Sequence, residues 1–322
     1  MHGILLSMRA DHWVLPALVL WPLLAALIVR LAGRDVSREE GNGEVPNDGL
    51  DARVLTLVAL VAEAMLGIAL WSVYDTETSG WHGRVDMPWL VDLGATFSLG
   101  VDGLSLPMVV FTVVLLPLTL LGSWNNVRVR TPAFGALILL LTSGLVGVLV
   151  SLDLLLFYLA WELMLIPTYL LIGIWGTGAA TRASLRYVLF TLVGSLLMLV
   201  AIVALWNAGG ATSFHLDHLR TIRLDERTQL LMFGACFLAF AVKSALVPFH
   251  TWLPDAQHSA PTFVAVTIGL KVGVYATLRF AIPLFPAAAM HPTVRGTILV
   301  LSVVAIVYGA LVAMAESCVI NY

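Results

Sequence analysis

Apolar residues run along this chain in segments of about 20 residues, with shorter polar stretches between them. A helix needs about 20 mostly apolar residues to cross the hydrocarbon core of a bilayer. The pattern therefore predicts an all-α polytopic membrane protein with about nine spanning helices. The predicted spans cover residues 13–32, 54–73, 104–124, 133–152, 154–175, 187–207, 229–251, 260–281 and 296–315.

Three longer polar stretches separate some of the predicted spans. The first has the sequence RDVSREEGNGEVPNDGLDAR, and the others cover residues 75–103 and 208–228. None of them is long enough for a separate soluble domain. The apolar run from Trp13 to Val29 has no small-residue cleavage site and further spans follow it, so it predicts a first span and not a signal peptide.

Composition supports a membrane protein without a cofactor site of its own. Hydrophobic residues make up 60% of the chain and charged residues 11%, against roughly a quarter charged in soluble proteins. The two cysteines, Cys236 and Cys318, form no CxxC pair, so neither an iron–sulfur cluster nor a zinc site is indicated. No GxGxxG fingerprint and no paired mid-span histidines are present. The net charge of −3 is uninformative, but the sequence has no basic block that would indicate a nucleic-acid partner.

Lysine and arginine are distributed differently along the predicted spans. All arginines lie in loops or at span ends, whereas both lysines, Lys243 and Lys271, lie inside spans. Arginine stays charged at biological pH, but a desolvated lysine can release its proton. Lys271 lies ~16 Å from the start of its span, too deep to reach the interface easily. Both lysines are therefore predicted to titrate, with a lysine that extends to an interface as the structural alternative.

Arginine placement also bears on orientation. The short loops 128–130 and 182–186 both carry arginines, which favours an N-terminus outside, although the count over all loops is nearly balanced. We expect a multi-pass protein of a bacterial inner membrane.

Glu162 is the predicted partner of a buried lysine. It lies ~12 Å into its span, and a charge at such depth needs a partner or water. Five residues later, Pro167 can bend the helix, because its ring frees a backbone carbonyl. A buried glutamate can also be a hydrogen-bonded structural group, and for Glu63 in the second span both interpretations stay open.

The segment AFAVKSALVPFHTWLPDAQHSAPT predicts a broken helix next to Lys243. Pro248, Pro254 and Pro261 interrupt an otherwise apolar stretch that also carries His250. Non-helical backbone at membrane depth is tolerated only against protein or a water-filled cavity. The break therefore indicates an aqueous pathway, in which His250 could relay protons or only cap the break. The alternative is a proline-kinked helix followed by an ordinary loop.

Three segments carry a resemblance to a known family: WELMLIPTYLLIGIWG, AFAVKSALVPFHTWLPDAQHSAPT and GLKVGVYATLRF. Together they resemble the antiporter-like subunit M of proton-pumping NADH:quinone oxidoreductase (complex I), whose mitochondrial counterpart is NADH dehydrogenase subunit 4. The match is collinear over residues 97–286. The proline- and histidine-containing segment is shared across the wider antiporter-like superfamily, whereas WELMLIP points to subunit M.

The resemblance implies a proton-translocating role without redox chemistry in this chain. It makes Glu162 and Lys243 an ion pair whose opening and closing accompany proton transfer through Lys271. Spans four to eight, residues 133–281, then form an inverted repeat with a broken seventh helix, after the N-terminal helices of residues 1–124. NADH, FMN, iron–sulfur clusters and quinone would belong to partner subunits. The expected partners are lipid and the other membrane subunits, especially the two other antiporter-like ones.

The end of the sequence departs from the family pattern. The family continues with a second repeat, whereas this chain ends with SCVINY, so residues 296–322 are expected to be a truncated start of that repeat. Two alternatives of the same site chemistry are a subunit of a multisubunit sodium/proton antiporter and a subunit of an energy-converting hydrogenase. A non-catalytic membrane scaffold is the third alternative.

Overall fold

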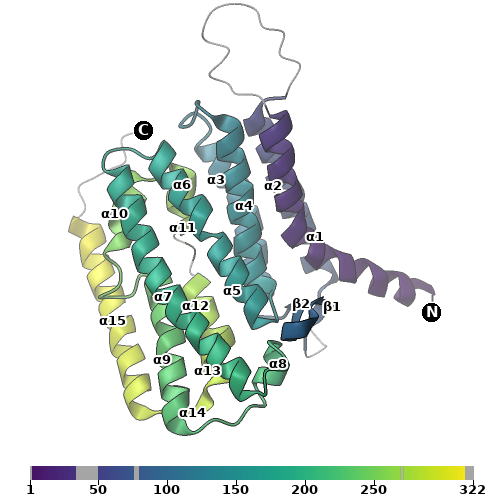
Figure 1. The fold of residues 1–322 in the computed structure, drawn as a ribbon. Helices are drawn as coiled ribbons and strands as arrows, with labels where there is room; N and C mark the ends of the chain where they lie inside the picture. Colours follow the sequence, from purple (N-terminus) through teal and green to yellow (C-terminus); the bar gives the residue numbers. More distant parts are fainter. Residues whose placement is uncertain (1, 34–49, 76–79, 269, 271, 316–322) are drawn as a thin grey trace, which may run out of the picture.

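The computed structural model describes residues 2–33, 50–75, 80–268, 270 and 272–315, and the side chains of residues 13 onward within these ranges, except 313 and 315. Helices running side by side form a bundle, with a small hairpin at its side near α5 (Leu154–Leu163) and α8 (Leu216–Leu219) (Figure 1). Within the described residues, eight helical segments are long and apolar enough to cross a membrane. They are Trp13–Ala32, Ala52–Val73, Ser105–Gly122, Thr131–Val150, Leu154–Trp175, Ala180–Ala208, Thr262–Leu284 and Pro292–Val312.

Several of these segments consist of more than one helix. The helices are α1 (His2–Ala32), α2 (Ala52–Val73), α3 (Ser105–Gly122), α4 (Thr131–Val150), α5 (Leu154–Leu163), α6 (Leu165–Trp175), α7 (Ala180–Ala208), α8 (Leu216–Leu219), α9 (Glu226–Lys243), α10 (Trp252–Ser259), α11 (Thr262–Ile268), α12 (Val272–Ala276), the π-helix Thr277–Ala281, α13 (Ile282–Leu284), α14 (Pro286–Met290) and α15 (Pro292–Ala315). The mostly helical membrane architecture predicted from the sequence is confirmed.

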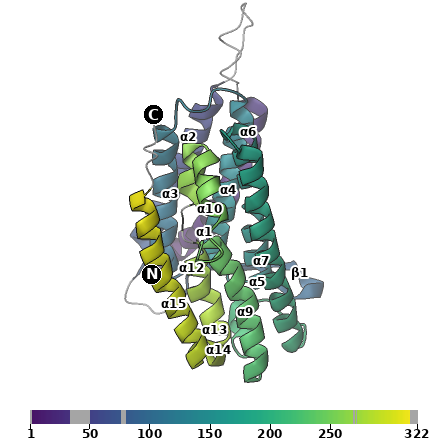
Figure 2. The same cartoon turned by 90° about the vertical axis from the view of Figure 1, so that its left-hand side faces the viewer.

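The helix α4 lies at the centre of the bundle, and α15 lies at its edge in both views (Figures 1 and 2). Most of α4 is buried, and it contacts α1, α2, α3, α5 and α6. Gly144 permits the close approach of α5, because a Cβ there would lie 2.8 Å from the Met164 side chain. On the outside of α7, by contrast, Leu189, Val193 and Val200 are exposed, as expected of a surface that faces lipid.

The predicted seventh span, residues 229–251, is a broken helix. The helix α9 ends at Lys243, the chain turns through residues 244–251, and α10 begins at Trp252. Trp252 Nε1 donates to the carbonyl oxygen of Val242 over 3.0 Å, which satisfies a carbonyl at the end of α9. The break that the prolines predicted is therefore present. Because α9 carries Glu226, Arg227 and Lys243 in 18 residues, it is the most polar of the long helices and is not one of the eight segments above.

The predicted eighth span is also interrupted, which the sequence pattern did not indicate. The helix α11 ends at Ile268 and α12 begins at Val272, with Leu270 in a bend between them. Residue 271, the second predicted titrating lysine, lies outside the described residues. Beyond α12 the backbone continues as the π-helix and α13.

A β-hairpin qualifies the prediction of an all-α fold. Strands β1 (His82–Leu90) and β2 (Ala95–Val101) pair antiparallel, with Met87 opposite Phe97. The turn between them ends at Gly94, whose φ of 68° and close approach to Thr212 O exclude a side chain. The sequence analysis treated residues 75–103 only as a non-spanning stretch.

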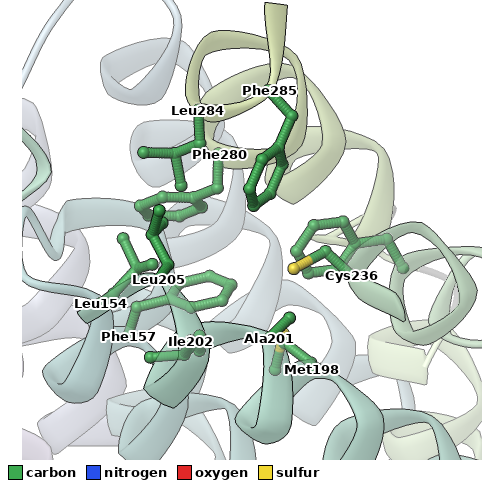
Figure 3. Close-up of a pocket in the computed structure, with 11 residues that line it drawn as sticks. Leu154, Phe157, Met198, Ala201, Ile202, Leu205, Cys236, Phe280, Leu284 and Phe285 are labelled. Atoms are coloured by element: carbon green, nitrogen blue, oxygen red, sulfur yellow. The ribbon is translucent and has the colours of Figure 1, made fainter. Parts of the chain in front are cut away.

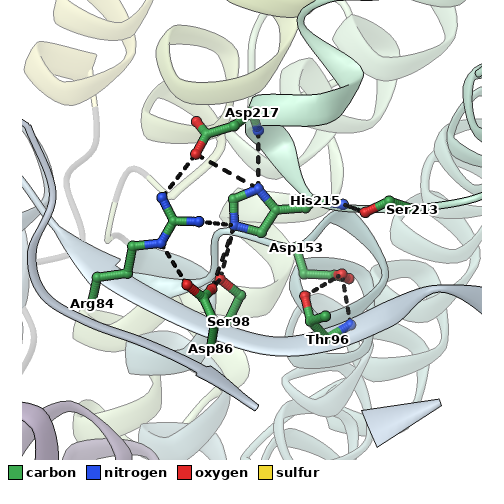
Figure 4. A network of polar contacts seen from close by, with 8 residues as sticks. All are labelled: Arg84, Asp86, Thr96, Ser98, Asp153, Ser213, His215 and Asp217. Atoms are coloured by element: carbon green, nitrogen blue, oxygen red, sulfur yellow. Dashed lines mark hydrogen bonds and ion pairs between the residues drawn. The ribbon is translucent and has the colours of Figure 1, made fainter. Parts of the chain in front are cut away.

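A network of charged and hydroxyl groups joins this hairpin to the loop before α9 (Figure 4). Arg84 forms ion pairs with Asp86 over 2.6 Å and with Asp217 over 2.9 Å, and its Nη2 lies 3.0 Å from His215 Nε2. Burial alone would raise the pKa of Asp86, but hydrogen bonds from Ser98 and Arg84 hold that pKa below its usual range. The network therefore fixes the hairpin against the ends of the spans.

Asp153 connects the hairpin to the fifth predicted span. Its Oδ1 accepts hydrogen bonds from the N–H groups of Leu155 and Leu156 and so caps α5, while its Oδ2 accepts from Thr96 on β2. Burial raises the pKa of Asp153, although these hydrogen bonds act to lower it. One carboxylate thus satisfies donors from both a strand and a membrane helix.

Candidate functional site

Glu162 lies at the end of α5, where the fifth predicted span is interrupted. Pro167 has no N–H to offer the carbonyl of Leu163, and the helix divides there into α5 and α6. The bend expected from Pro167 is therefore observed. The Glu162 side chain is half-buried, and its Oε1 is buried with no hydrogen-bond partner among the described residues.

Lys243 is held by aromatic side chains at the end of α9. Its Nζ donates a hydrogen bond to the Tyr187 hydroxyl over 3.1 Å. The same ammonium lies 5.5 Å from the centroid of the Trp161 ring and 5.4 Å from that of Tyr187. Cations within about 6 Å of an aromatic face are stabilised by the ring quadrupole. Lys243 is thus partly desolvated but not isolated.

The expected ion pair between Glu162 and Lys243 is not formed in this structure. Within the described part of the chain, neither side chain has an ion-pair partner, and the Lys243 ammonium lies over the Trp161 ring instead. Rings on α5 and α9 do pack together, since Trp161 lies 5.5 Å from Phe240 between centroids. The structure therefore brings the two helices together without joining the two charges.

A small cavity adjoins Lys243. The space open to the centre of a water molecule is about 20 Å³, and roughly 10–15 Å³ is enough to hold one water. Its polar lining comes from Lys243, Tyr187, Thr168 and Thr267, and it also reaches Leu270 and Val272. Those last two residues flank position 271 in the chain, which itself lies outside the described residues.

His250 lies in the break between α9 and α10, but it does not line this cavity. Its ring makes an edge contact with Tyr308 of α15, with centroids 5.0 Å apart and planes at 73°. Its Nδ1 is buried with no hydrogen-bond partner among the described residues. The structure therefore places His250 against α15 and leaves its predicted relay role untested.

A second cavity, which is apolar and has about 10 Å³ open to the centre of a water molecule, lies between α5, α7, α9 and the stretch from the π-helix to residue 285 (Figure 3). Its lining is apolar apart from the thiol of Cys236. The rings of Phe157 and Phe280 that border it lie only 4.2 Å apart. We therefore assign it to packing of aromatic side chains.

The sequence analysis missed one buried ion pair. Arg279, in the π-helix, is 5% exposed and pairs with both carboxylate oxygens of Asp102, which lies in the turn before α3. Burial acts to raise the pKa of Asp102, but the bonds from Arg279 hold it below the usual range. The two residues lie 177 positions apart and no local pattern links them, so sequence periodicity could not have found the pair.

Glu63 is a second buried carboxyl group. It is 1% exposed on the inner face of α2, and neither of its oxygens has a hydrogen-bond partner among the described residues. It lies apart from the residues that line the cavity beside Lys243. Its role stays open, as the sequence left it.

The fold and the site together define a polytopic membrane protein of the antiporter-like class. Its marks are helices long enough to span a membrane, a helix broken at a half-buried lysine, and a glutamate in an earlier span. Comparison with known families gives the narrower assignment. The chain belongs to the NADH:quinone oxidoreductase/Mrp antiporter transmembrane family, whose model matches residues 151–319. The resemblance found in the sequence is confirmed at this level.

Curated relatives extend the similarity over nearly the whole chain. It is 38% identical over 309 residues to NADH-quinone oxidoreductase subunit M of Rhodobacter capsulatus, covering 92% of this chain and 58% of that protein. Against subunit M of Escherichia coli K12 it is 36% identical over 283 residues, covering 82% of this chain and 55% of the relative. The chain therefore spans a little over half the length of the relatives it matches.

Solved structures show the same fold. A chain in respiratory complex I from Thermus thermophilus with bound NADH superposes with a TM-score of 0.80 at 31% identity, covering 94% of this chain and 59% of that one. A chain of the Mrp complex from a Dietzia species superposes with a TM-score of 0.69 at 21% identity, covering 86% of this chain and 29% of that one. The second likeness concerns the fold alone.

Proposed function

We propose that this chain translocates protons as a non-redox membrane subunit of an NADH:quinone oxidoreductase. The observation that carries the proposal is Lys243, half-buried and without an ion pair among the described residues, beside a water-sized cavity at a helix break. The names of its relatives support the same conclusion. Oxidation of NADH and reduction of quinone, with FMN and iron–sulfur clusters, are assigned to partner subunits.

The chemistry follows from the surroundings of Lys243. A lysine ammonium can release its proton when it is desolvated, and the Tyr187 hydroxyl 3.1 Å away can accept a hydrogen bond from it or donate one to the neutral amine. Glu162 supplies a second proton-binding group in the neighbouring helix. Pairing the two would favour a charged lysine, and separating them, as in this structure, would favour proton release.

Two further residues complete the proposed path. Lys271 is assigned the central position beyond Lys243, on the strength of its place in the sequence between Leu270 and Val272, which border the cavity. His250 is assigned to proton relay at the break, because its buried Nδ1 has no hydrogen-bond partner within the part of the chain that the structure describes. Residues 133–281 are proposed as the translocating repeat, between the helices of residues 1–124 and a second unit that starts in residues 296–322.

The proposal extends to assembly and location. The structural neighbours belong to multisubunit complexes, which supports other membrane subunits as partners, especially the two other antiporter-like ones. A bacterial inner membrane is the proposed location, in keeping with the bacterial relatives.

A subunit of a sodium/proton antiporter is the second candidate, because the family that matches includes Mrp antiporters. An energy-converting hydrogenase subunit would use the same site. The cationic Lys243 at the cavity opposes a sodium ion by charge repulsion, so we favour proton transfer.

The test uses inside-out membrane vesicles from cells that produce the chain together with the other subunits of the proposed NADH:quinone oxidoreductase. We expect Lys243→Met, Lys243→Arg and Glu162→Gln to lower NADH-driven proton uptake, measured with a pH-sensitive dye. Lys271→Arg should lower it too, since arginine cannot release the proton. Arg182→Gln, at an exposed position on α7, is the control and should pump normally. Normal pumping in both arginine variants would contradict the proposal, and uptake driven by a sodium gradient instead of NADH would favour the antiporter.

A further inference from the structure

Arg279 has a complete set of partners, although the proposed function gives it no role. Its Nη1 donates to Asp102 Oδ2 over 2.8 Å, Nη2 donates to Oδ1, and Nε donates to the Tyr275 hydroxyl over 3.1 Å. The guanidinium carbon also lies 4.7 Å from the centroid of the Trp81 ring. Two parallel bonds to one carboxylate fix the orientation of the side chain as well as its position.

The backbone at Arg279 is unusual. Arg279 lies in the π-helix Thr277–Ala281, and such turns within helices occur frequently at functional sites. The neighbouring Tyr275 donates its hydroxyl to Leu149 O over 2.7 Å, which ties the same segment to α4. The ion pair therefore anchors the π-helix between the start of α3 and the central helix.

A row of aromatic rings leads from the π-helix to Lys243. Phe280, the residue after Arg279, lies 4.2 Å from Phe157 between ring centroids. Phe157 lies 5.6 Å from Trp161, whose ring faces the Lys243 ammonium at 5.5 Å. Protein interiors are close-packed, so one ring of such a row cannot shift without moving the next.

We propose that Arg279 is a positioning residue. Its ion pair with Asp102 holds the π-helix and, through Phe280 and Phe157, sets the place of the Trp161 ring against which Lys243 rests. This inference deepens the proposed function and rests on it where it concerns proton transfer. The substitution Arg279→Lys keeps the positive charge but removes the bidentate pair of hydrogen bonds to Asp102. It therefore distinguishes an effect of hydrogen-bond geometry from an effect of charge.

The test follows the Trp161 ring directly. The chain is labelled with 5-fluorotryptophan, and the Trp161 ¹⁹F resonance is assigned from its loss in Trp161→Phe. We expect Arg279→Lys and Asp102→Glu to shift that resonance and to lower NADH-driven proton uptake about tenfold or more, as misplacement of a reacting group does. Arg84→Gln, which breaks the ion pair with Asp217 outside the bundle, should leave the Trp161 resonance in place.

An unchanged Trp161 resonance in folded Arg279→Lys would overturn the inference, whatever the transport rate. A shifted resonance in a protein whose unmodified form moves no protons would instead contradict the proposed function and leave the positioning role standing. Should Arg279→Lys and Asp102→Glu fail to fold, Tyr275→Phe removes both the bond from Arg279 Nε and the bond from Tyr275 to Leu149 O, and a resonance unchanged there would likewise overturn the inference.

Discussion

Arg279 and Lys243 are both cations inside the helical bundle, yet their surroundings differ. Arg279 is matched by a carboxylate on two of its nitrogens and by a tyrosine on the third. Lys243 has one neutral hydroxyl and two ring faces, and Glu162 has an oxygen with no partner among the described residues. A fixed charge in a membrane protein needs fixed partners, whereas a site that gains and loses a proton must be tolerable in both forms.

Breaking the ion pair between Asp102 and Arg279 should have the largest effect on the stability of the fold. Asp102→Ala leaves the buried Arg279 charge uncompensated, and loss of one partner of such a pair costs about 3–5 kcal/mol. We expect a correspondingly lower free energy of unfolding, measured for the purified chain in detergent. The matched comparison is Glu162→Gln, which breaks no ion pair. Equal losses in the two variants would remove the distinction between the two regions.

Adding volume beside Lys243 should have the next largest effect. A Cβ at Gly273 would lie 2.4 Å from both Phe240 O and Ser244 Oγ, at the junction of α12 with the helix break. We expect Gly273→Ala to destabilise the chain by about 1–3 kcal/mol, the usual range for overpacking. In Gly309→Ala on α15, where nothing lies within 4 Å, stability should be unchanged or slightly higher. The measurement is the thermal unfolding temperature of each variant and of the unmodified chain in the same detergent.

Removing the charge of Lys243 should change stability by at most about 1 kcal/mol, because no ion pair is broken. We expect Lys243→Met to unfold at nearly the same temperature as the unmodified chain while its proton transport is lost. A loss as large as that of Asp102→Ala would show that Lys243 is a structural charge of the same kind as Arg279.

The smallest effect is expected outside the membrane, at Asp86. Burial acts to raise its pKa, but Ser98 and Arg84 hold the folded pKa below the unfolded value. The carboxylate therefore stabilises the fold fully above its unfolded pKa of about 4, and this contribution is lost as pH falls through the folded pKa. Because the side chain is 43% exposed, the loss is at most about 1 kcal/mol.

The measurement compares the unfolding temperature at about pH 7 with that at about pH 3, for Asp86→Asn and for the unmodified chain. We expect the difference between the two pH values to be smaller in Asp86→Asn. An equal difference in the two proteins would contradict this prediction.

The sequence predicted what depends on local patterns. Spans follow from runs of apolar residues, and the break after Lys243 follows from prolines that cannot continue a helix. The contacts of Lys243 with Tyr187 and Trp161 could not be predicted, because they depend on how α5, α7 and α9 rotate against one another. The hairpin was missed although its second strand alternates regularly, with apolar Ala95, Phe97, Leu99 and Val101 between Thr96, Ser98 and Gly100, because residues 75–103 were considered only as a stretch too polar to span a membrane.

The Asp102–Arg279 pair also has a consequence for biogenesis. A chain is synthesised at about 5–20 residues per second, so the 177 residues between the two positions take roughly 9–35 s to follow. Over that interval the Asp102 carboxylate exists without its partner. The contact between Asp102 and the π-helix therefore cannot form until the segment Thr262–Leu284 has been synthesised, although α3 to α9 precede it in the chain.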